Sequence, residues 1–143
     1  MNRKPTDFRL SLEELTGHDA GDPEDQENAP TPMIRDILRS CKKPLCQLTA
    51  YEIGDLVIQH YGYPYVLDLV WPKLRENPLY DGDNYPGMVL ALLIKADPGI
   101  WADRREYKDE LSVFYQMALE RPEDESEAFR ESLGLPHARS SMN

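Results

Sequence analysis

The sequence predicts an all-α fold, a compact single domain of about six helices. Apolar residues recur at helical spacing in successive segments, residues that start or end helices flank those segments, and no stretch forms a convincing strand. At 143 residues, with 41% apolar and 29% charged side chains, the chain has the size and composition of one globular domain. We expect three parts: an acidic, mostly irregular N-terminal arm (1–30) with one helical turn, a helical domain (31–134) and a frayed tail (135–143).

The N-terminal arm is acidic and is interrupted by glycines and prolines. Residues 11–30 contain seven acidic residues and no Lys or Arg, and two glycines and two prolines interrupt them. Charge-rich segments of this kind usually stay solvated, so we expect a mobile arm. The exception is residues 11–17, where Ser11 can cap a helical turn, Glu14 completes a capping box and Gly17 can end the turn.

Two helices are predicted in the first half of the domain. Thr31 can cap the first, Pro32 suits its first position, and apolar residues recur over about three turns. Those residues are Met33, Ile34, Ile37, Leu38 and Cys41. Thr49 and Glu52 form a second capping box, which opens a helix that closes at residues 61–63. The basic residues near the C-terminal end of the first helix are interpreted as structural charges: Arg35, Arg39, Lys42 and Lys43.

A third helix is predicted to open at Pro64 and to end at residues 76–78. Its apolar face contains Val66, Leu67, Val70, Trp71 and Leu74. Pro72 lies inside this pattern, where it removes a backbone hydrogen bond and costs about 3 kcal/mol. We therefore expect a kink near Asp68 or a break into two short pieces. Trp71 is predicted to lie in the core, because its indole buries a large apolar area.

The segment Glu76–Gly87 is predicted to be a shaped loop. It contains two prolines and two glycines, which cannot all lie inside a helix without a loss of backbone hydrogen bonds or backbone entropy. It also carries three carboxylates, Glu76, Asp81 and Asp83, and no basic residue. The loop therefore offers negative charge and aromatic surface between two apolar segments.

Three further helices complete the prediction. Residues 88–94 are apolar on every side and are therefore expected to be central; a buried strand fits the periodicity too, but Ala, Leu and Met favour a helix. Residues 107–119 form the strongest amphipathic pattern in the chain. Residues 122–132 are expected to form a last, acidic helix.

The residues that commonly carry catalysis or bind metals do not form a recognisable motif. Cys41 and Cys46 stand five apart with no second cysteine pair or close histidine, so we expect no zinc site and two reduced, buried thiols. The run that begins at Asp81 lacks the glycine and glutamate of a calcium-binding loop. No phosphate loop, nucleophile elbow or His-Glu-x-x-His helix is present. We therefore expect a protein without metal or cofactor, and not an enzyme.

The charge of the chain favours a basic protein partner. Its formal net charge of −10 argues against nucleic-acid binding, because nucleic-acid-binding proteins neutralise phosphates with clustered Lys and Arg. No run of about 18 apolar residues is present to cross a membrane, and no apolar segment follows the charged N-terminus as it would in a secretory signal. We expect a cytoplasmic location.

An ordered series of short motifs runs from the arm to the end of the loop. It comprises Ser11–Gly17, Lys43-Pro44-Leu45 with Leu48-Thr49, Gln59 and Gly62, Asn77-Pro78-Leu79, Gly82-Asp83, Tyr85 and Gly87. In this order, over roughly residues 11–95, the chain resembles the immunity proteins of bacterial contact-dependent growth inhibition (CDI) systems. The resemblance implies a non-enzymatic inhibitor that binds the C-terminal toxin domain of a delivered protein and protects the cell that makes the inhibitor. Many such toxins are nucleases with basic grooves, which an acidic inhibitor would complement.

The candidate toxin-contacting residues combine tyrosines, which suit interface anchors, with carboxylates. They are Tyr80, Asp81, Asp83 and Tyr85 of the loop, with some of Asp22, Glu24 and Asp25 of the arm. An open alternative is that the tyrosines pack on the domain and that Asp83 or Asn84 caps the next helix. Part of the loop also carries the family resemblance, and features shared across a family more often fix the fold than select a partner, so the loop can position the interface more than it forms it. Two other functions stay open: an acidic adaptor or regulatory module that binds another basic cytosolic protein, and a small hydrolase that uses acidic residues.

Overall fold

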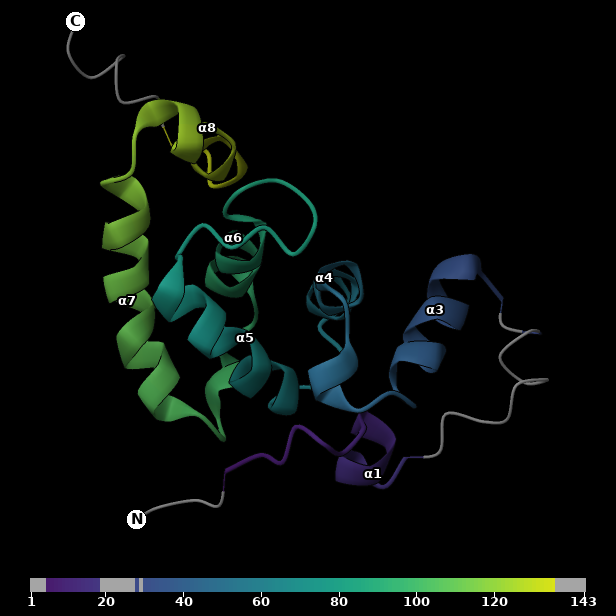
Figure 1. Cartoon of the computed structure of the whole chain (residues 1–143). Helices are drawn as coiled ribbons and strands as arrows, with labels where there is room; N and C mark the ends of the chain where they lie inside the picture. The colour runs from purple at the N-terminus through teal and green to yellow at the C-terminus, as the bar shows by residue number, and fades with distance from the viewer. Residues whose placement is uncertain (1–4, 19–27, 29, 136–143) are drawn as a thin grey trace, which may run out of the picture.

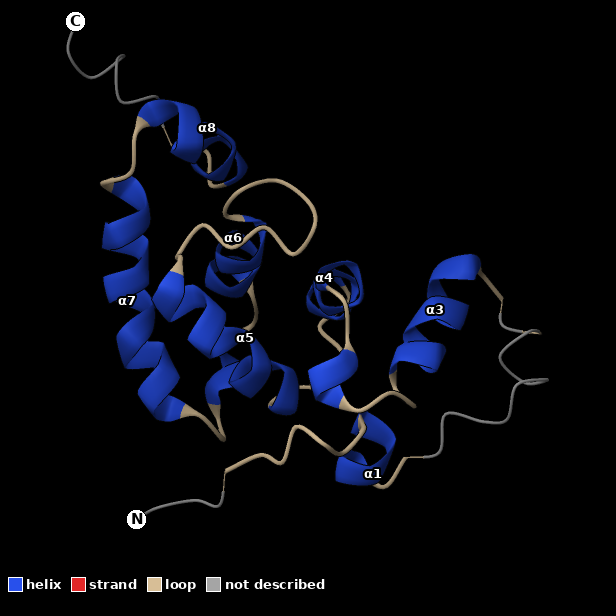
Figure 2. Ribbon diagram, viewed as in Figure 1, coloured by secondary structure: helices blue, strands red, loops and turns tan. Residues whose placement is uncertain are grey.

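The computed structural model describes residues 5–18, 28 and 30–135, and every regular element within them is a helix (Figures 1 and 2). The α-helices are α1 (Leu12–Thr16), α3 (Pro32–Ser40), α4 (Ala50–Ile58), α5 (Tyr65–Glu76), α6 (Met88–Lys95), α7 (Arg105–Leu119) and α8 (Glu123–Ser132), with two short 3-10 helices at Leu45–Gln47 and Pro98–Trp101. The predicted all-α fold is confirmed, and α1 is the turn expected within the arm. None of the helices in the described residues is long and apolar enough to cross a membrane.

Helix α6 occupies the centre of the fold. Five of its eight residues are buried: Met88, Val89, Leu90, Ala91 and Leu93. It packs against α4 on one side and against α7 and α8 on the other, while α3 joins the rest of the fold mainly through α4 (Figure 1). The helical prediction for this segment is therefore confirmed over the buried-strand alternative.

The local signals that start the first helices are confirmed. Ser11 Oγ accepts a hydrogen bond from the Glu14 backbone at 3.1 Å, and the Glu14 carboxylate accepts one from the Ser11 backbone at 3.0 Å. Thr49 and Glu52 form the same reciprocal pair at the start of α4, with distances of 3.1 and 3.0 Å. Thr31 caps α3 through its side-chain oxygen. These caps satisfy backbone N–H groups that have no partner within their own helices.

We expect Thr49→Ala to lower the free energy of unfolding by about 1 kcal/mol, because it removes the acceptor of the Glu52 backbone N–H. Denaturant unfolding of the variant and the parent protein measures the difference. The matched control is Thr49→Ser, which keeps the hydroxyl and should unfold like the parent. An unchanged unfolding midpoint for the alanine variant would show that the cap contributes nothing.

Helix α5 is continuous through Pro72, so the expected break into two pieces is wrong; a kink near Asp68 stays a prediction. Pro72 itself is exposed, whereas Trp71 and Leu74 beside it are fully buried. Each large apolar side chain contributes roughly 1.5–3 kcal/mol on burial, so the several buried on α5 outweigh the roughly 3 kcal/mol that a helical proline costs. The Trp71 ring stacks on Tyr107 at 4.2 Å between centroids, which confirms Trp71 as a core residue.

The two cysteines lie in different environments. Cys41 is buried at the end of α3, and its burial raises the pKa of the thiol. Cys46 is exposed, so the expectation of a buried thiol is wrong for this residue. The buried positions around Cys46 are taken by Leu45 of the short helix and by Leu48, which follows that helix. Both thiols are free.

Two of the basic residues that follow α3 have a structural role, as predicted. Lys42 Nζ lies 2.8 Å from a Glu13 carboxylate oxygen and ties α3 to α1. Lys43 Nζ lies 2.8 Å from the carboxylate of Glu52, which also belongs to the α4 capping box. These pairs link the ends of α1, α3 and α4 at the surface.

Candidate functional site

The loop between α5 and α6 is held at both ends by its own hydrogen bonds. Asn77 Oδ1 accepts a hydrogen bond from the Leu79 N–H at 3.0 Å, and the Tyr80 N–H donates to the Asn77 carbonyl at 3.0 Å. The Gly87 N–H donates to the Leu79 carbonyl at 2.9 Å and closes the loop just before α6. Pro78 and Leu79 are buried. The loop is therefore a fixed feature of the surface.

The middle of the loop is pressed against α4. A Cβ atom added to Gly54 of α4 would lie 2.2 Å from the Gly82 carbonyl oxygen, a distance at which two atoms cannot coexist. Gly82 itself has a φ of +55°, a left-handed conformation that glycine adopts without strain. Two glycines, one from each segment, thus allow the two backbones to approach closely. This contact fixes the distance between the loop and α4.

The four predicted loop residues lie together, in two environments. The Asp81 and Asp83 side chains are exposed, and the Asp81 carboxylate accepts a hydrogen bond from the Asp83 N–H at 2.9 Å. Tyr80 and Tyr85 are half-buried and pack against the core. Burial, together with the nearby charges of Asp81 and Asp83, raises the pKa of the Tyr80 hydroxyl. The loop therefore presents negative charge beside partly accessible tyrosines.

The alternative interpretation of the loop holds only in part. The tyrosines do pack on the domain, and Lys73 Nζ lies 5.6 Å from the centre of the Tyr80 ring. However, α6 begins after Gly87 with no side-chain cap, so neither Asp83 nor Asn84 caps it. The remaining candidates, Asp22, Glu24 and Asp25, lie outside the described residues.

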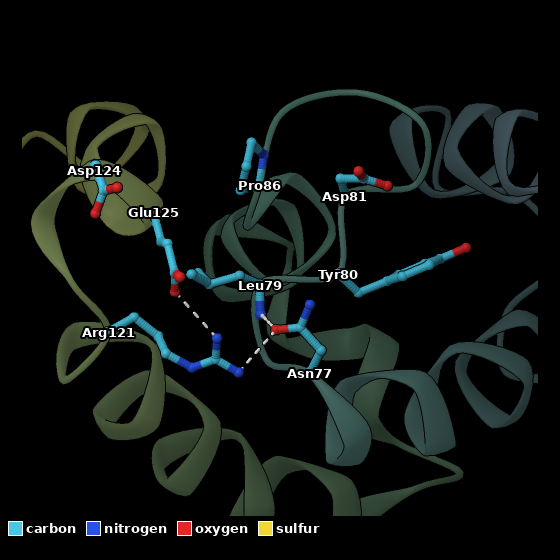
Figure 3. Close-up of a pocket in the computed structure, with 8 residues that line it drawn as sticks. All are labelled: Asn77, Leu79, Tyr80, Asp81, Pro86, Arg121, Asp124 and Glu125. Atoms are coloured by element: carbon cyan, nitrogen blue, oxygen red, sulfur yellow. Dashed lines mark hydrogen bonds and ion pairs between the residues drawn. The ribbon is translucent and has the colours of Figure 1, made fainter.

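An open cavity of about 450 Å³ separates the loop from the start of α8 (Figure 3). Its lining residues are Asn77, Leu79, Tyr80, Asp81, Pro86, Arg121, Asp124 and Glu125. The Arg121 guanidinium crosses the cavity and donates to Asn77 Oδ1 and to Glu125 Oε2, each at 3.2 Å. In Figure 3, Tyr80 and Asp81 point away from Arg121. Three carboxylates against one guanidinium leave the cavity net negative.

Arg121, Asp124 and Glu125 were missed by the sequence reasoning. The sequence shows an acidic start to the last helix, but nothing in it places that helix beside the loop. The contact that does so is made by Gly87, where an added Cβ would lie 2.7 Å from the Phe129 Cβ of α8. Within the described residues, no group of three or more His, Cys, Asp or Glu side chains is arranged to hold a metal ion.

The fold and this surface define a class of protein. It is a small helical domain with a hydrogen-bonded loop that carries exposed carboxylates beside half-buried tyrosines. The chain matches the family model of CDI immunity proteins over residues 18–111, which is more than half of its length. It therefore belongs to the CDI immunity protein family, whose members bind CDI toxins, and the resemblance seen in the sequence is confirmed.

The match covers the loop, α3 and α4, whereas α8 and the Arg121 side of the cavity lie beyond it. Comparisons with curated proteins and with solved structures found no match.

Proposed function

We propose that this protein neutralises the C-terminal toxin domain of a CDI system by binding it in the cytosol of the producing cell. It acts without catalysis, by occupying the toxin surface. Membership of the CDI immunity family supports the partner, and the fixed loop with Asp81 and Asp83 exposed beside Tyr80 and Tyr85 supports the site. Asp22, Glu24 and Asp25 add negative charge that attracts the same toxin domain.

The charge of the chain indicates what kind of toxin it fits. With a formal net charge of −10, the protein attracts a basic surface over a distance of about 8–10 Å at physiological salt. A nuclease has such a surface where it binds the phosphates of its substrate. A basic nuclease domain is therefore the toxin that this inhibitor fits best.

The size of a stable complex sets how much surface must take part. A typical specific interface buries about 800 Å² on each partner, which is about a tenth of the 8519 Å² exposed by this chain. The loop has only a few exposed side chains, so further residues must contact the toxin.

Co-expression with the toxin domain encoded beside this protein tests the proposal. Growth should be restored when both are produced, and the two should co-purify as a complex that resists dilution. Growth arrest that persists despite soluble, folded inhibitor would refute the proposed function. Binding to a basic protein other than a toxin, without rescue of growth, would favour the adaptor function instead.

We expect neutralisation of the loop charges to weaken the complex about tenfold or more. The variant Asp81→Asn with Asp83→Asn removes two charges but preserves geometry. The amide oxygen introduced at position 81 can still accept the loop hydrogen bond, and asparagine tolerates the left-handed backbone of position 83. Titration calorimetry at low and high salt measures the affinity and its salt dependence, which should both fall.

The control for this variant removes the same number of charges from α7 and its C-terminal end. Asp109 and Glu120 are both exposed on α7 or at its end, so Asp109→Asn with Glu120→Gln should change the affinity less than about threefold. Equal losses for the two double variants would show that only net charge matters and that the loop has no special role.

A further inference from the structure

A stripe on α4 lies next to the loop, with Tyr51 and Gln59 exposed and Asp55 half-buried. Tyr51, Asp55 and Gln59 recur every four residues and so share one face of the helix, with Gln59 at its C-terminal cap. Tyr51 is 55% exposed, the most exposed large apolar side chain in the described residues. We call these three residues the α4 stripe.

The loop borders one side of the α4 stripe. Gly54 precedes Asp55 and lies about 100° away around the helix, where it meets Gly82 of the loop. Tyr51, three residues before Gly54, lies on the neighbouring part of the same face. Tyr51 and Asp55 therefore lie beside the point at which the loop meets α4.

Helix α3 borders the other side of the α4 stripe. Gln59 Nε2 lies 2.9 Å from the sulfur of Met33, and at the opposite end Ser40 Oγ donates to the Glu52 carboxylate at 3.4 Å. Figure 1 shows α4 between α3 and the loop. The loop, the α4 stripe and the edge of α3 thus form one continuous surface across three segments of the chain.

The α3 edge adds apolar anchors to this surface. Met33, which contacts Gln59, is 45% exposed, and Ile34, the next residue of α3, is 42% exposed. Methionine and tyrosine are enriched in the buried centres of protein interfaces. Exposed apolar side chains on both α3 and α4, beside acidic groups, are the composition of an interface core with a polar rim.

The carboxylates of this surface repel one another. Burial raises the pKa of Asp55, and the nearby charges of Asp36 on α3 and of Glu52 raise it further. Because the folded-state pKa of Asp55 is raised, its contribution to stability is present at low pH, where it is protonated. That contribution is lost as pH rises through the folded-state pKa, so the ionised Asp55 opposes folding at neutral pH. A positive charge brought by a partner would relieve this repulsion.

We propose that the α4 stripe, together with Met33 and Ile34, is the centre of the toxin-binding surface and receives a basic element of the toxin that carries Arg or Lys side chains. The proposal rests on the proposed function and assigns its interface. The aliphatic part of an Arg or Lys side chain covers Tyr51 and Met33, and its charge lies between Asp36, Asp55 and the loop carboxylates.

The test compares single variants of the α4 stripe with matched variants on α7. Tyr51→Ala should weaken toxin binding tenfold or more, because interface tyrosines act as anchors. Asp55→Asn should weaken binding by about threefold or more and reduce its salt dependence, while thermal stability stays the same or rises because repulsion is removed. Met33→Lys gives an independent variant at the α3 edge and should also weaken binding.

The controls use exposed residues on α7. Val113 is 52% exposed and Asp109 is exposed, so Val113→Ala and Asp109→Asn should leave the affinity within about twofold. If wild-type protein binds the toxin and all three surface variants bind it equally well, the inference fails while the proposed function stands. If wild-type protein does not bind the toxin, both fail. A melting curve for each variant separates lost binding from lost folding.

Discussion

Asp68→Ala is expected to lower the free energy of unfolding by about 3–5 kcal/mol, because it leaves a buried guanidinium without its counter-charge. Asp68 of α5 and Arg104, just before α7, are 7% and 6% exposed. Arg104 donates to both carboxylate oxygens, at 2.7 Å through Nε and at 2.6 Å through Nη2. The hydroxyls of Tyr107 and Thr6 donate to the same carboxylate. One side chain thus joins α5, the start of α7 and the N-terminal segment.

The same carboxylate makes stability depend on pH. Burial acts to raise the pKa of Asp68, but the hydrogen bonds from Arg104, Thr6 and Tyr107 outweigh burial and hold the pKa below its ordinary value. A lowered folded-state pKa gives stability that is present above the unfolded-state pKa, about 3.9, and is lost as pH falls through the folded-state value. Urea unfolding at pH 7 and at about pH 3 should show this loss of stability in the parent protein. The Asp68→Ala variant should lack the part of the pH dependence that comes from Asp68.

A surface pair between the same helices provides the control. Glu110 of α7 accepts two hydrogen bonds from Arg75 of α5, each at 2.8 Å, but the two side chains are 30% and 55% exposed. Glu110→Gln keeps an acceptor for the Trp71 indole N–H and should cost less than about 1 kcal/mol. Losses of equal size for the two substitutions would show that burial does not set the cost of breaking these pairs.

The fold was predictable wherever the deciding interaction is local. The capping boxes at Ser11 and Thr49 join residues three apart, so the sequence contains both partners, and both helix starts are confirmed. The effect of Pro72 on its helix was predicted wrongly because the interactions that decide it are not local in the sequence. Its helix is held by the burial of Trp71 against Trp101, Tyr107 and Phe114, all at least 30 residues further along the chain.

The candidate site was predictable in composition but not in extent. The prolines, glycines and carboxylates of residues 76–87 identify a shaped acidic loop from the sequence alone. Its neighbours depend on contacts between distant segments, since Gly87 against Phe129 places α8 beside the loop and Gly54 against Gly82 places α4 there. Each glycine in these contacts can be recognised as close packing only when the opposing backbone or ring is known.

Gly54→Ala is expected to lower the free energy of unfolding by about 1–3 kcal/mol, although alanine is the better helix former. Helix propensity alone favours the substitution by about 1 kcal/mol in the middle of α4. The added Cβ, however, would lie 2.2 Å from the Gly82 carbonyl oxygen and 3.2 Å from its carbonyl carbon. A backbone carbonyl cannot rotate away like a side chain, so the whole loop must shift, and the steric cost exceeds the gain in propensity.

The shift should weaken toxin binding as well as lower stability. Denaturant unfolding measures the stability, and calorimetry measures toxin affinity at a temperature where the variant is fully folded. Gly17→Ala is the control, because its added Cβ meets nothing within 4 Å and the cost, about 1–2 kcal/mol, comes only from the left-handed backbone. Gly17→Ala should therefore lose stability but retain its affinity for the toxin.

Gly54→Ala separates two ways in which the loop can contribute. The Gly54–Gly82 contact sets the position of Asp81 and Asp83 relative to Tyr51 and Asp55. If the loop and the α4 stripe bind the toxin as one surface, a displaced loop misaligns both, and the affinity should fall by more than tenfold although the protein is folded. If affinity is unchanged while stability falls, the loop is a structural connection, and toxin recognition lies elsewhere on the domain.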